Sequence, residues 1–276
     1  MKQSELSWRS YDGINIFGQI WAPPGEAKGI ICLVHGLGEH SSRYAHLANY
    51  FLDSGFAVIA SDLRGHGKSG GQKGHTPSYD HYCDEIELLI EKSVQLFPET
   101  PRFLYGHSMG GLLALYYIIQ RQPEIKGAII TSPALISPAL KSKITGAAIR
   151  ILSLITPRFS VPNGIDPTTL SRDSVVGKTY LNDPLVHDKI SARNLKEMLR
   201  TPKFIRKYSS EIKIPLLIMH GTADKITSIK GSEELAQIIT TNCTYKPWDG
   251  YRHELHNELE KDQVYQYLVN WLNETM

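Results

Sequence analysis

The segment GHSMGG, residues 106–111, constrains this chain more than any other feature, because it places a serine in the pattern G-x-S-x-G. An apolar run, residues 103–105, comes directly before it, and a largely apolar run, residues 112–120, follows. This context predicts a sharp turn from a buried strand into a buried helix, with glycines where side chains would block close approach. Such a turn raises Ser108 above the sheet and directs the amino end of the helix at the oxyanion of an acyl transfer. Ser108 is therefore the candidate nucleophile.

Apolar runs without polar alternation repeat along the chain and predict parallel strands that are buried on both faces. These runs are residues 30–34, 56–60, 103–105, 128–130 and 216–219. Helical patterns at residues 43–53, 79–97, 110–121 and 232–240 lie between or after them, and a last strand (244–248) and helix (262–272) follow. Residues 4–21 alternate around a turn at residues 11–13, which predicts an antiparallel hairpin at one sheet edge. The sequence therefore predicts an α/β fold, with a mostly parallel eight-stranded sheet and helices on both faces.

The alternation of strand and helix is interrupted between residues 137 and 210. This stretch has no strand-like run, and its three or so helical patterns are separated by prolines and an Asn-Gly pair. We expect a helical cap, or lid, of residues 137–210 inserted into a core domain of residues 1–136 and 211–276. The cap would cover the carboxyl ends of the strands, where Ser108 also lies.

The first cap helix, expected over residues 140–155, is amphipathic. Its apolar positions are Leu140, Ile144, Ala147, Ala148, Ile151, Leu152 and Ile155, and its basic residues are Lys141, Lys143 and Arg150. The apolar positions are explained by packing onto the core domain. The alternative is peripheral contact with a membrane or micelle, where the basic residues would favour anionic surfaces.

Composition excludes several classes of protein. The 276 residues include 30 Lys plus Arg and 28 Asp plus Glu, and a formal charge of +2 is too balanced for a nucleic-acid partner. Residues 1–10 lack the apolar core of a signal peptide, and the longest apolar run, residues 112–119, is too short to span a bilayer, so we expect a cytoplasmic protein. The cysteines, Cys32, Cys83 and Cys243, lie too far apart to suggest a disulfide framework or a zinc site.

A serine nucleophile needs a base and an orienting carboxylate, and both occur downstream. Asp224 lies at the end of the strand predicted at residues 216–219, and Asp249 is the rival acid. His253 follows the last predicted strand and a glycine turn, and His256 is the rival base three positions later. We predict Asp224 and His253, since the chain order Ser108, Asp224, His253 is that of α/β-hydrolases.

The oxyanion of the reaction needs two hydrogen-bond donors. The residue after the nucleophile, Met109, supplies one backbone N–H, and Leu37, in the glycine-containing segment after strand 30–34, is expected to supply the other. We interpret His35 as a hydrogen-bonded structural residue. Residues 62–69 are expected to buttress the same loops.

Three competing motifs fail. The sequence GKS at residues 67–69 lacks the earlier glycine of a phosphate loop, and HELH at residues 253–256 has its second histidine one position too early for a zinc protease. The pair Gly36 and Gly38 lacks the third glycine of a dinucleotide fingerprint. We therefore expect no metal and no cofactor.

The strings HGLGEHSSRY (35–44), GHSMGG (106–111), HGTAD (220–224) and YRHELHNE (251–258), together with the segments 62–71, 170–172 and 180–185, resemble the monoacylglycerol lipases. The resemblance covers nearly the whole chain. It implies a narrow acyl pocket and a polar end that binds glycerol, at the matching positions Glu39, Arg43, Tyr180 and His256. For Glu39 and Arg43 an internal salt bridge remains an alternative role, and for Tyr180 the alternative is packing of the cap.

Two positions depart from the pattern of this family. Leu37 stands where a smaller residue is common, and Thr227 stands where the mammalian enzymes have a cysteine. The second departure predicts that reagents aimed at a thiol in this place do not inhibit the protein.

The expected reaction is hydrolysis of a monoacylglycerol to glycerol and a fatty acid through an acyl-serine intermediate. The main alternative is a lysophospholipase or a broad carboxylesterase, since an acyl tunnel says little about the leaving group. A non-catalytic binding protein on a hydrolase fold is the alternative from a different class. The sequence predicts neither the chain length of the substrate nor the oligomeric state.

Overall fold

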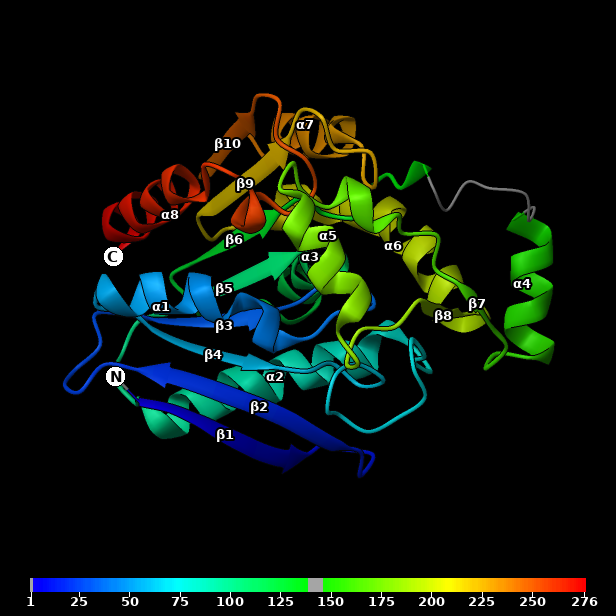
Figure 1. Ribbon diagram of the computed structural model, residues 1–276, viewed down its shortest axis with the longest axis horizontal. Helices are drawn as coiled ribbons and strands as arrows, with labels where there is room; N and C mark the ends of the chain where they lie inside the picture. Colours follow the sequence, from blue (N-terminus) through cyan, green and yellow to red (C-terminus); the bar gives the residue numbers. More distant parts are fainter. Residues whose placement is uncertain (1, 139–145) are drawn as a thin grey trace.

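The computed structural model describes residues 2–138 and 146–276, and its centre is one eight-stranded sheet (Figure 1). The spatial order of the strands is β1-β2-β4-β3-β5-β6-β9-β10. Their bounds are β1 Lys2–Arg9, β2 Asn15–Ala22, β3 Ile30–Val34, β4 Ala57–Ser61, β5 Arg102–His107, β6 Gly127–Thr131, β9 Leu216–Gly221 and β10 Cys243–Trp248. The strands β1 and β2 pair antiparallel, and β2 pairs antiparallel with β4. The remaining neighbours in the order β4-β3-β5-β6-β9-β10 pair in parallel. The predicted fold class is confirmed.

The central strands are buried on both faces, as their unbroken apolar runs predict. In β3, Ile30, Cys32 and Val34 belong to one hydrophobic cluster, whereas Ile31 and Leu33 belong to another. This alternation follows from the two-residue period of a strand, which turns successive side chains to opposite faces of the sheet. Each face therefore needs its own layer of helices.

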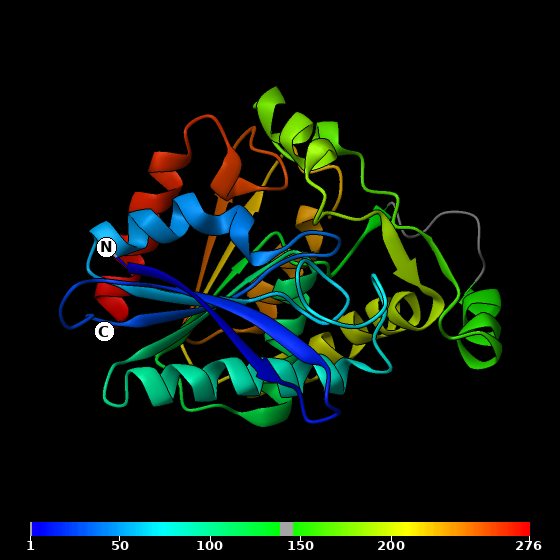
Figure 2. The same cartoon turned by 60° about the horizontal axis from the view of Figure 1, so that its bottom comes forward.

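Helices cover both faces of the sheet. The helices α1 (Ala45–Asp53) and α8 (Lys261–Thr275) supply one cluster, and α2 (Tyr79–Leu96), α3 (Met109–Arg121) and α7 (Ile229–Ile238) supply the other. Figure 2 shows α1, in blue, and α8, in red, on the side of the sheet opposite to α2, in blue-green. Within residues 2–138 and 146–276, no helix is both long and apolar enough to cross a membrane.

The segment between β6 and β9 lies beyond the carboxyl ends of the parallel strands (Figure 1). It contains the helices α4 (Gly146–Ile155), α5 (Ser174–Asn182) and α6 (Ala192–Tyr208). Residues 140–145 of the predicted first cap helix, with Leu140, Lys141, Lys143 and Ile144, lie outside the described residues.

The expectation that residues 137–210 contain no strand is wrong. The strands β7 (Ser160–Pro162) and β8 (Lys189–Ser191) form a small antiparallel pair. Each strand has three residues, which is too short for a periodic pattern to be recognised. The pairing depends on a contact across about thirty residues of chain, which local sequence does not report.

The cap is joined to the core domain through α6. Leu195, Met198 and Ile205 of this helix are buried in the same hydrophobic cluster as the residues of α3. A hydrogen bond also holds the loop before α6, because the backbone N–H of His187 donates to the carbonyl of Gly38 at 2.9 Å. The cap segment and the loop after β3 therefore lie against each other.

Candidate active site

Ser108 lies at the turn between β5 and α3, with a φ of 55° and a ψ of −116°. A positive φ in a residue other than glycine is strained, and it is retained where the surrounding structure fixes it. Two hydrogen bonds do so, because the N–H of Ser108 donates to Thr131 at 2.9 Å and its carbonyl accepts from Leu112 at 3.0 Å. The side chain of Ser108 is half-buried and therefore remains accessible.

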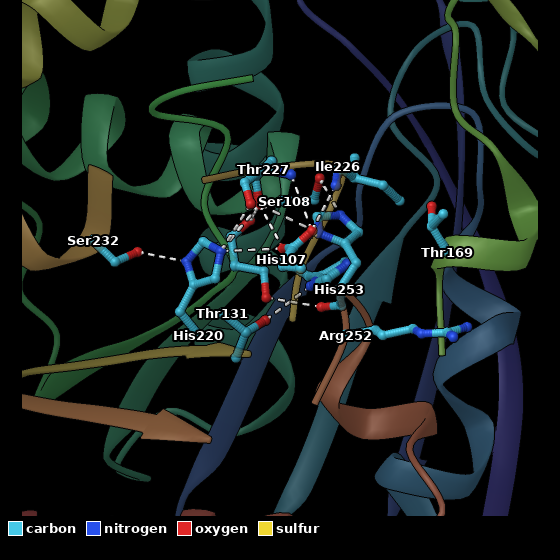
Figure 3. Close-up of polar contacts among 12 residues, drawn as sticks. His107, Ser108, Thr131, Thr169, His220, Ile226, Thr227, Ser232, Arg252 and His253 are labelled. Carbon is cyan, nitrogen blue, oxygen red and sulfur yellow. Dashed lines mark hydrogen bonds and ion pairs between the residues drawn. The ribbon is translucent and has the colours of Figure 1, made fainter. Parts of the chain in front are cut away.

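The structure brings Ser108, His253 and Asp224 into one hydrogen-bonded chain. Figure 3 shows Ser108 and His253 beside each other in this chain. The imidazole Nε2 of His253 lies 2.9 Å from the hydroxyl oxygen of Ser108. Its Nδ1 lies 2.7 Å from Oδ2 of Asp224. With the proton on Nδ1, the imidazole donates to the carboxylate and accepts from the serine hydroxyl, which is the arrangement a general base requires.

Asp224 is held by further donors. Its Oδ1 accepts from the backbone N–H groups of Ile226 and Thr227, at 2.8 and 3.0 Å. Its Oδ2 accepts from the hydroxyl of Thr227 at 2.8 Å and lies 3.1 Å from Nε2 of His220. Burial opposes ionisation of Asp224, but the charge of His253 and the hydrogen bonds from His220 and His253 outweigh burial and hold its pKa well below the usual range. The carboxylate is therefore ionised at neutral pH.

The surroundings of His253 favour its protonated form. The ring is 3% exposed, and this burial alone would lower the pKa. The negative charge of Asp224 and its hydrogen bond outweigh burial, with smaller help from Glu254 and Glu39, so the pKa of His253 is raised. An imidazole with a raised pKa is a stronger acceptor for a serine proton.

The loop after β3 packs against Ser108. A Cβ atom at Gly36 would stand 2.8 Å from Oε1 of Glu39 and 3.2 Å from Cβ of Ser108, so glycine permits an approach that a side chain would crowd. Leu37, Ser108 and Met109 line one pocket, so both residues predicted to supply oxyanion donors lie beside the nucleophile. His35 is fully buried, with Nδ1 2.8 Å from the carbonyl of Gly36 and Nε2 accepting from the N–H of Leu63 at 2.9 Å.

Glu39 and Arg43 are engaged in a buried ionic cluster. Nη1 of Arg43 donates to Oε2 of Glu39 at 2.5 Å and to Oε1 of Glu254 at 2.7 Å, and its Nη2 donates to Oε2 of Glu254 at 2.8 Å. Oε1 of Glu39 accepts from the N–H of Gly36 and from the hydroxyl of Tyr44, both at 2.7 Å. The internal salt bridge that the sequence left open therefore exists.

Tyr180 and His256 lie next to this cluster. The guanidinium carbon of Arg43 stands 4.9 Å from the centre of the Tyr180 ring, and the buried hydroxyl of Tyr180 has no hydrogen-bond partner among the described residues. The ring of His256 stacks on Tyr44 with centroids 4.5 Å apart. His256 is inaccessible to solvent, and burial lowers its pKa to about 3, so the ring is neutral.

The pocket beside Ser108 is narrow, with a volume of about 30 Å³. The cap forms part of its wall through Asn163, Ile165 and Met198. A larger cavity of about 370 Å³ shares Asn163 and Ile165 with it, and Tyr180 lines this second cavity. Asn163 and Ile165 therefore border both spaces.

The rival acid, Asp249, lies away from His253. Asp249 is exposed and accepts a hydrogen bond from the hydroxyl of Thr222 at 3.1 Å. Sequence reasoning missed Glu254 and His220 as members of the site. The signal for Glu254 was its place directly after His253, and for His220 its place at the end of the strand that carries Asp224. Among residues 2–138 and 146–276, no group of three or more His, Cys, Asp or Glu side chains is arranged to hold a metal ion.

Comparisons with known proteins agree with this geometry. A family model described as serine aminopeptidase, S33, matches residues 25–260. Phospholipase YtpA of Bacillus subtilis is 33% identical over 86% of this chain and 92% of its own length. Monoacylglycerol lipase of Mycolicibacterium smegmatis is 29% identical over 98% of this chain and 97% of its own. An uncharacterized abhydrolase domain-containing protein of Dictyostelium discoideum is 37% identical over 92% of this chain, which spans only 27% of that protein.

Solved structures support the same relationship. The crystal structure of the monoacylglycerol lipase of Paleococcus ferrophilus has a TM-score of 0.84 and 34% identity, and the match covers 100% of both chains. The resemblance predicted from the sequence is thereby confirmed. The chain belongs to the serine aminopeptidase S33 family of α/β-hydrolases, and it is an ester hydrolase related to the monoacylglycerol lipases.

Proposed function

We propose that this protein hydrolyses monoacylglycerols to glycerol and a free fatty acid, with Ser108 as nucleophile, His253 as base and Asp224 as the orienting carboxylate. The observation that carries the proposal is the hydrogen-bonded chain from Ser108 through His253 to Asp224, beside a narrow pocket. The relatives and the solved structure named as monoacylglycerol lipases support the choice of substrate.

The reaction proceeds in two halves. As Ser108 attacks the ester carbonyl, its proton passes to Nε2 of His253, and Asp224 stabilises the imidazolium that forms. The N–H groups of Leu37 and Met109 bind the oxyanion. His253 then gives the proton to the departing glycerol oxygen, which leaves an acyl-serine. A water molecule that loses its proton to His253 hydrolyses this ester, releases the fatty acid and restores the serine.

The polar end of the substrate site is assigned to Glu39, Arg43, Tyr180 and His256. Tyr180 is the member assigned to glycerol, because it lines the larger cavity, which shares Asn163 and Ile165 with the Ser108 pocket, and its buried hydroxyl has no hydrogen-bond partner among the described residues. Glu39, Arg43 and His256 form the wall behind it, since each is largely buried among protein groups. The ammonium group of an aminopeptidase substrate would find no free carboxylate at Glu39, because Glu39 already accepts hydrogen bonds from Arg43 and Tyr44.

The pocket beside Ser108 is narrow, with a volume of about 30 Å³. An acyl chain therefore requires the cap of residues 137–210 to move outward from the core of residues 1–136 and 211–276. The cap presents apolar residues for this step at a lipid surface, because Ile151, Leu154 and Ile155 of α4 are 57%, 69% and 75% exposed. The partner of this face is a membrane or micelle that contains the substrate.

A lysophospholipase is the second candidate, because phospholipase YtpA is among the relatives. Fatty-acid release should be measured from equimolar monoacyl-, diacyl- and triacylglycerol and lysophosphatidylcholine of one chain length. The blank is Ser108→Ala, which we expect to stay folded and to lose several orders of magnitude in kcat. Preference for monoacylglycerol supports the proposal, and preference for the lysolipid would replace it. Turnover by Ser108→Ala equal to wild type would refute the assigned nucleophile.

A further inference from the structure

A chain of buried side chains joins the loop that carries His253 to the loop that carries Leu37. Glu254 follows His253 directly and binds Arg43 through two hydrogen bonds, and Arg43 also binds Glu39. Glu39 in turn accepts the N–H of Gly36 at 2.7 Å. We infer that Glu254 and Arg43 are positioning residues, which hold the backbone N–H of Leu37 in place relative to His253. This inference rests on the proposed function of the site.

The direction of the Leu37 N–H is fixed through its own peptide unit. That unit is planar and trans, so its N–H and the carbonyl of Gly36 point in opposite directions. Nδ1 of His35 lies 2.8 Å from the carbonyl oxygen of Gly36. The carboxylate of Glu39 accepts from the N–H of Gly36, which belongs to the preceding peptide unit. We therefore expect displacement of the Glu39 carboxylate to shift Gly36, whose carbonyl belongs to the peptide that presents the N–H of Leu37.

Arg43 is the part that ties the two loops together. Both terminal nitrogens of its guanidinium donate to protein carboxylates, and its side chain is 9% exposed, against 4% for Glu39 and 2% for Glu254. Burial opposes the charge of Arg43, but the carboxylates of Glu254 and Glu39 outweigh burial and raise its pKa well above the usual value. Without this cation two buried carboxylates would face each other and separate or take up protons.

Asn257 and Leu170 strengthen the link at the His253 end. The side-chain amide of Asn257 donates to Oε2 of Glu254 at 2.6 Å. The backbone N–H of Glu254 donates to the carbonyl of Leu170 at 2.8 Å. Asn257 therefore holds the side chain of Glu254 within its own loop, and Leu170 holds its backbone against the segment between β6 and β9.

The chain offers a matched control in Glu258. This residue lies on the same loop, its carboxylate is fully buried, and it receives the Nε of Arg172 at 2.8 Å. It also accepts the backbone N–H of Arg252 at 2.8 Å. None of its described hydrogen bonds reaches Arg43, Glu39 or the segment 36–37. Glu258→Gln therefore removes an ion pair of a buried carboxylate on the same loop without touching the link to Leu37.

The test uses the full chain and two readouts on each variant. The first is kcat and KM on one monoacylglycerol, with the active-site concentration titrated by a fluorophosphonate, so that unfolded molecules do not count. The second is inhibition by a trifluoromethyl ketone of the same chain length, which adds to the serine hydroxyl and places an oxyanion in the donor site. A side chain that only stabilises the fold changes neither readout per titrated site.

Glu254→Gln is expected to lower kcat about tenfold and to weaken inhibition by the ketone about tenfold, with KM changed less than about threefold. The effect is smaller than the loss of a whole oxyanion donor, which costs about 10²- to 10³-fold, because the donor is displaced and not removed. Arg43→Lys, which keeps the charge and loses the forked contact, should change both readouts in the same direction and serves if Glu254→Gln does not fold. Glu258→Gln should leave both within about twofold of wild type.

Two results would overturn the inference. One is that Glu254→Gln and Arg43→Lys match wild type per titrated site. The other is that Glu258→Gln loses as much kcat and ketone affinity as Glu254→Gln. If the wild-type chain hydrolyses no ester at all, the proposed function fails first and the inference fails with it.

Discussion

At the scale of single residues, the acid–base behaviour of the site follows from the groups that surround His253. Burial opposes the protonated form of His253, whereas the carboxylates of Asp224, Glu254 and Glu39 favour it. The carboxylates prevail, so the pKa is raised from 6.5. Because attack requires an unprotonated His253, kcat/KM should rise with pH through an inflection above that value.

This pH dependence is checked by a kcat/KM profile on a monomeric ester. Asp224→Asn should move the inflection to lower pH, because the main negative charge beside the ring is removed. It should also lower kcat by about 10⁴-fold, since the imidazole then takes the wrong tautomer. An inflection that stays in place in Asp224→Asn would mean that a group other than His253 titrates.

Thr227 determines the response to thiol reagents. It lines the pocket with Ser108, and its hydroxyl donates to Asp224 at 2.8 Å. The natural cysteines are poor targets, because burial raises the pKa of the Cys32 thiol to about 12 and that of Cys243 to about 11. A maleimide should leave wild type and Thr227→Ser active and should inactivate Thr227→Cys. Inactivation of wild type would contradict this assignment.

At the scale of elements, α4 presents one buried and one exposed side. Ile149 is 5% exposed and packs into the core cluster, and Leu152 lines a small cavity against α6, whereas Ile151 and Ile155 face outward. Packing therefore explains the buried side of this helix, and contact with lipid is our proposal for the exposed side. Leu152 is the wrong residue with which to test lipid contact, because its substitution would disturb packing.

The exposed side of α4 is tested by Ile151→Ser with Ile155→Ser. Contact with lipid aggregates predicts a lower ratio of micellar to monomeric turnover, with monomeric turnover unchanged, since only the aggregate meets this face. The matched control is Val175→Ser with Leu181→Ser on α5, which are 61% and 68% exposed. An unchanged ratio, or an equal fall in the control, would remove α4 as the contact.

At the scale of the whole molecule, the proposed cap contributes to the hydrophobic core through α6. Leu195, Met198 and Ile205 bury their side chains against the layer that contains α3. Burial of such a side chain contributes about 2 kcal/mol, and a protein of ordinary stability has only about 5–15 kcal/mol in total. Replacing residues 146–208 by a short Gly-Ser linker should therefore abolish cooperative thermal unfolding measured by circular dichroism.

The control for this deletion is the Ile151→Ser, Ile155→Ser variant, which alters the same segment without removing a core residue. It should unfold cooperatively at nearly the wild-type temperature. A deletion variant that still unfolds in one sharp transition would show that the core of residues 1–136 and 211–276 folds alone, and that the cap is dispensable for stability.

The elements of the core were predictable from sequence because their signals are local. Unbroken apolar runs identified the parallel strands, and the glycines around Ser108 identified the turn at which the nucleophile stands. The ends differ by a few residues, as for β5, which continues to His107 and so leads directly into Ser108. The pair β7 and β8 was missed, because strands of three residues carry no periodic signal.

By itself, the sequence determined the fold class, the order of Ser108, Asp224 and His253, and the family, because each depends on a pattern within a short segment or on chain order. Tertiary structure alone decided which of these side chains meet and what else joins them. The approach of Glu254 to Arg43, 211 positions apart, and the enclosure of His256 depend on how distant loops pack. No local pattern carries that information, since burial and pairing are properties of the assembled core.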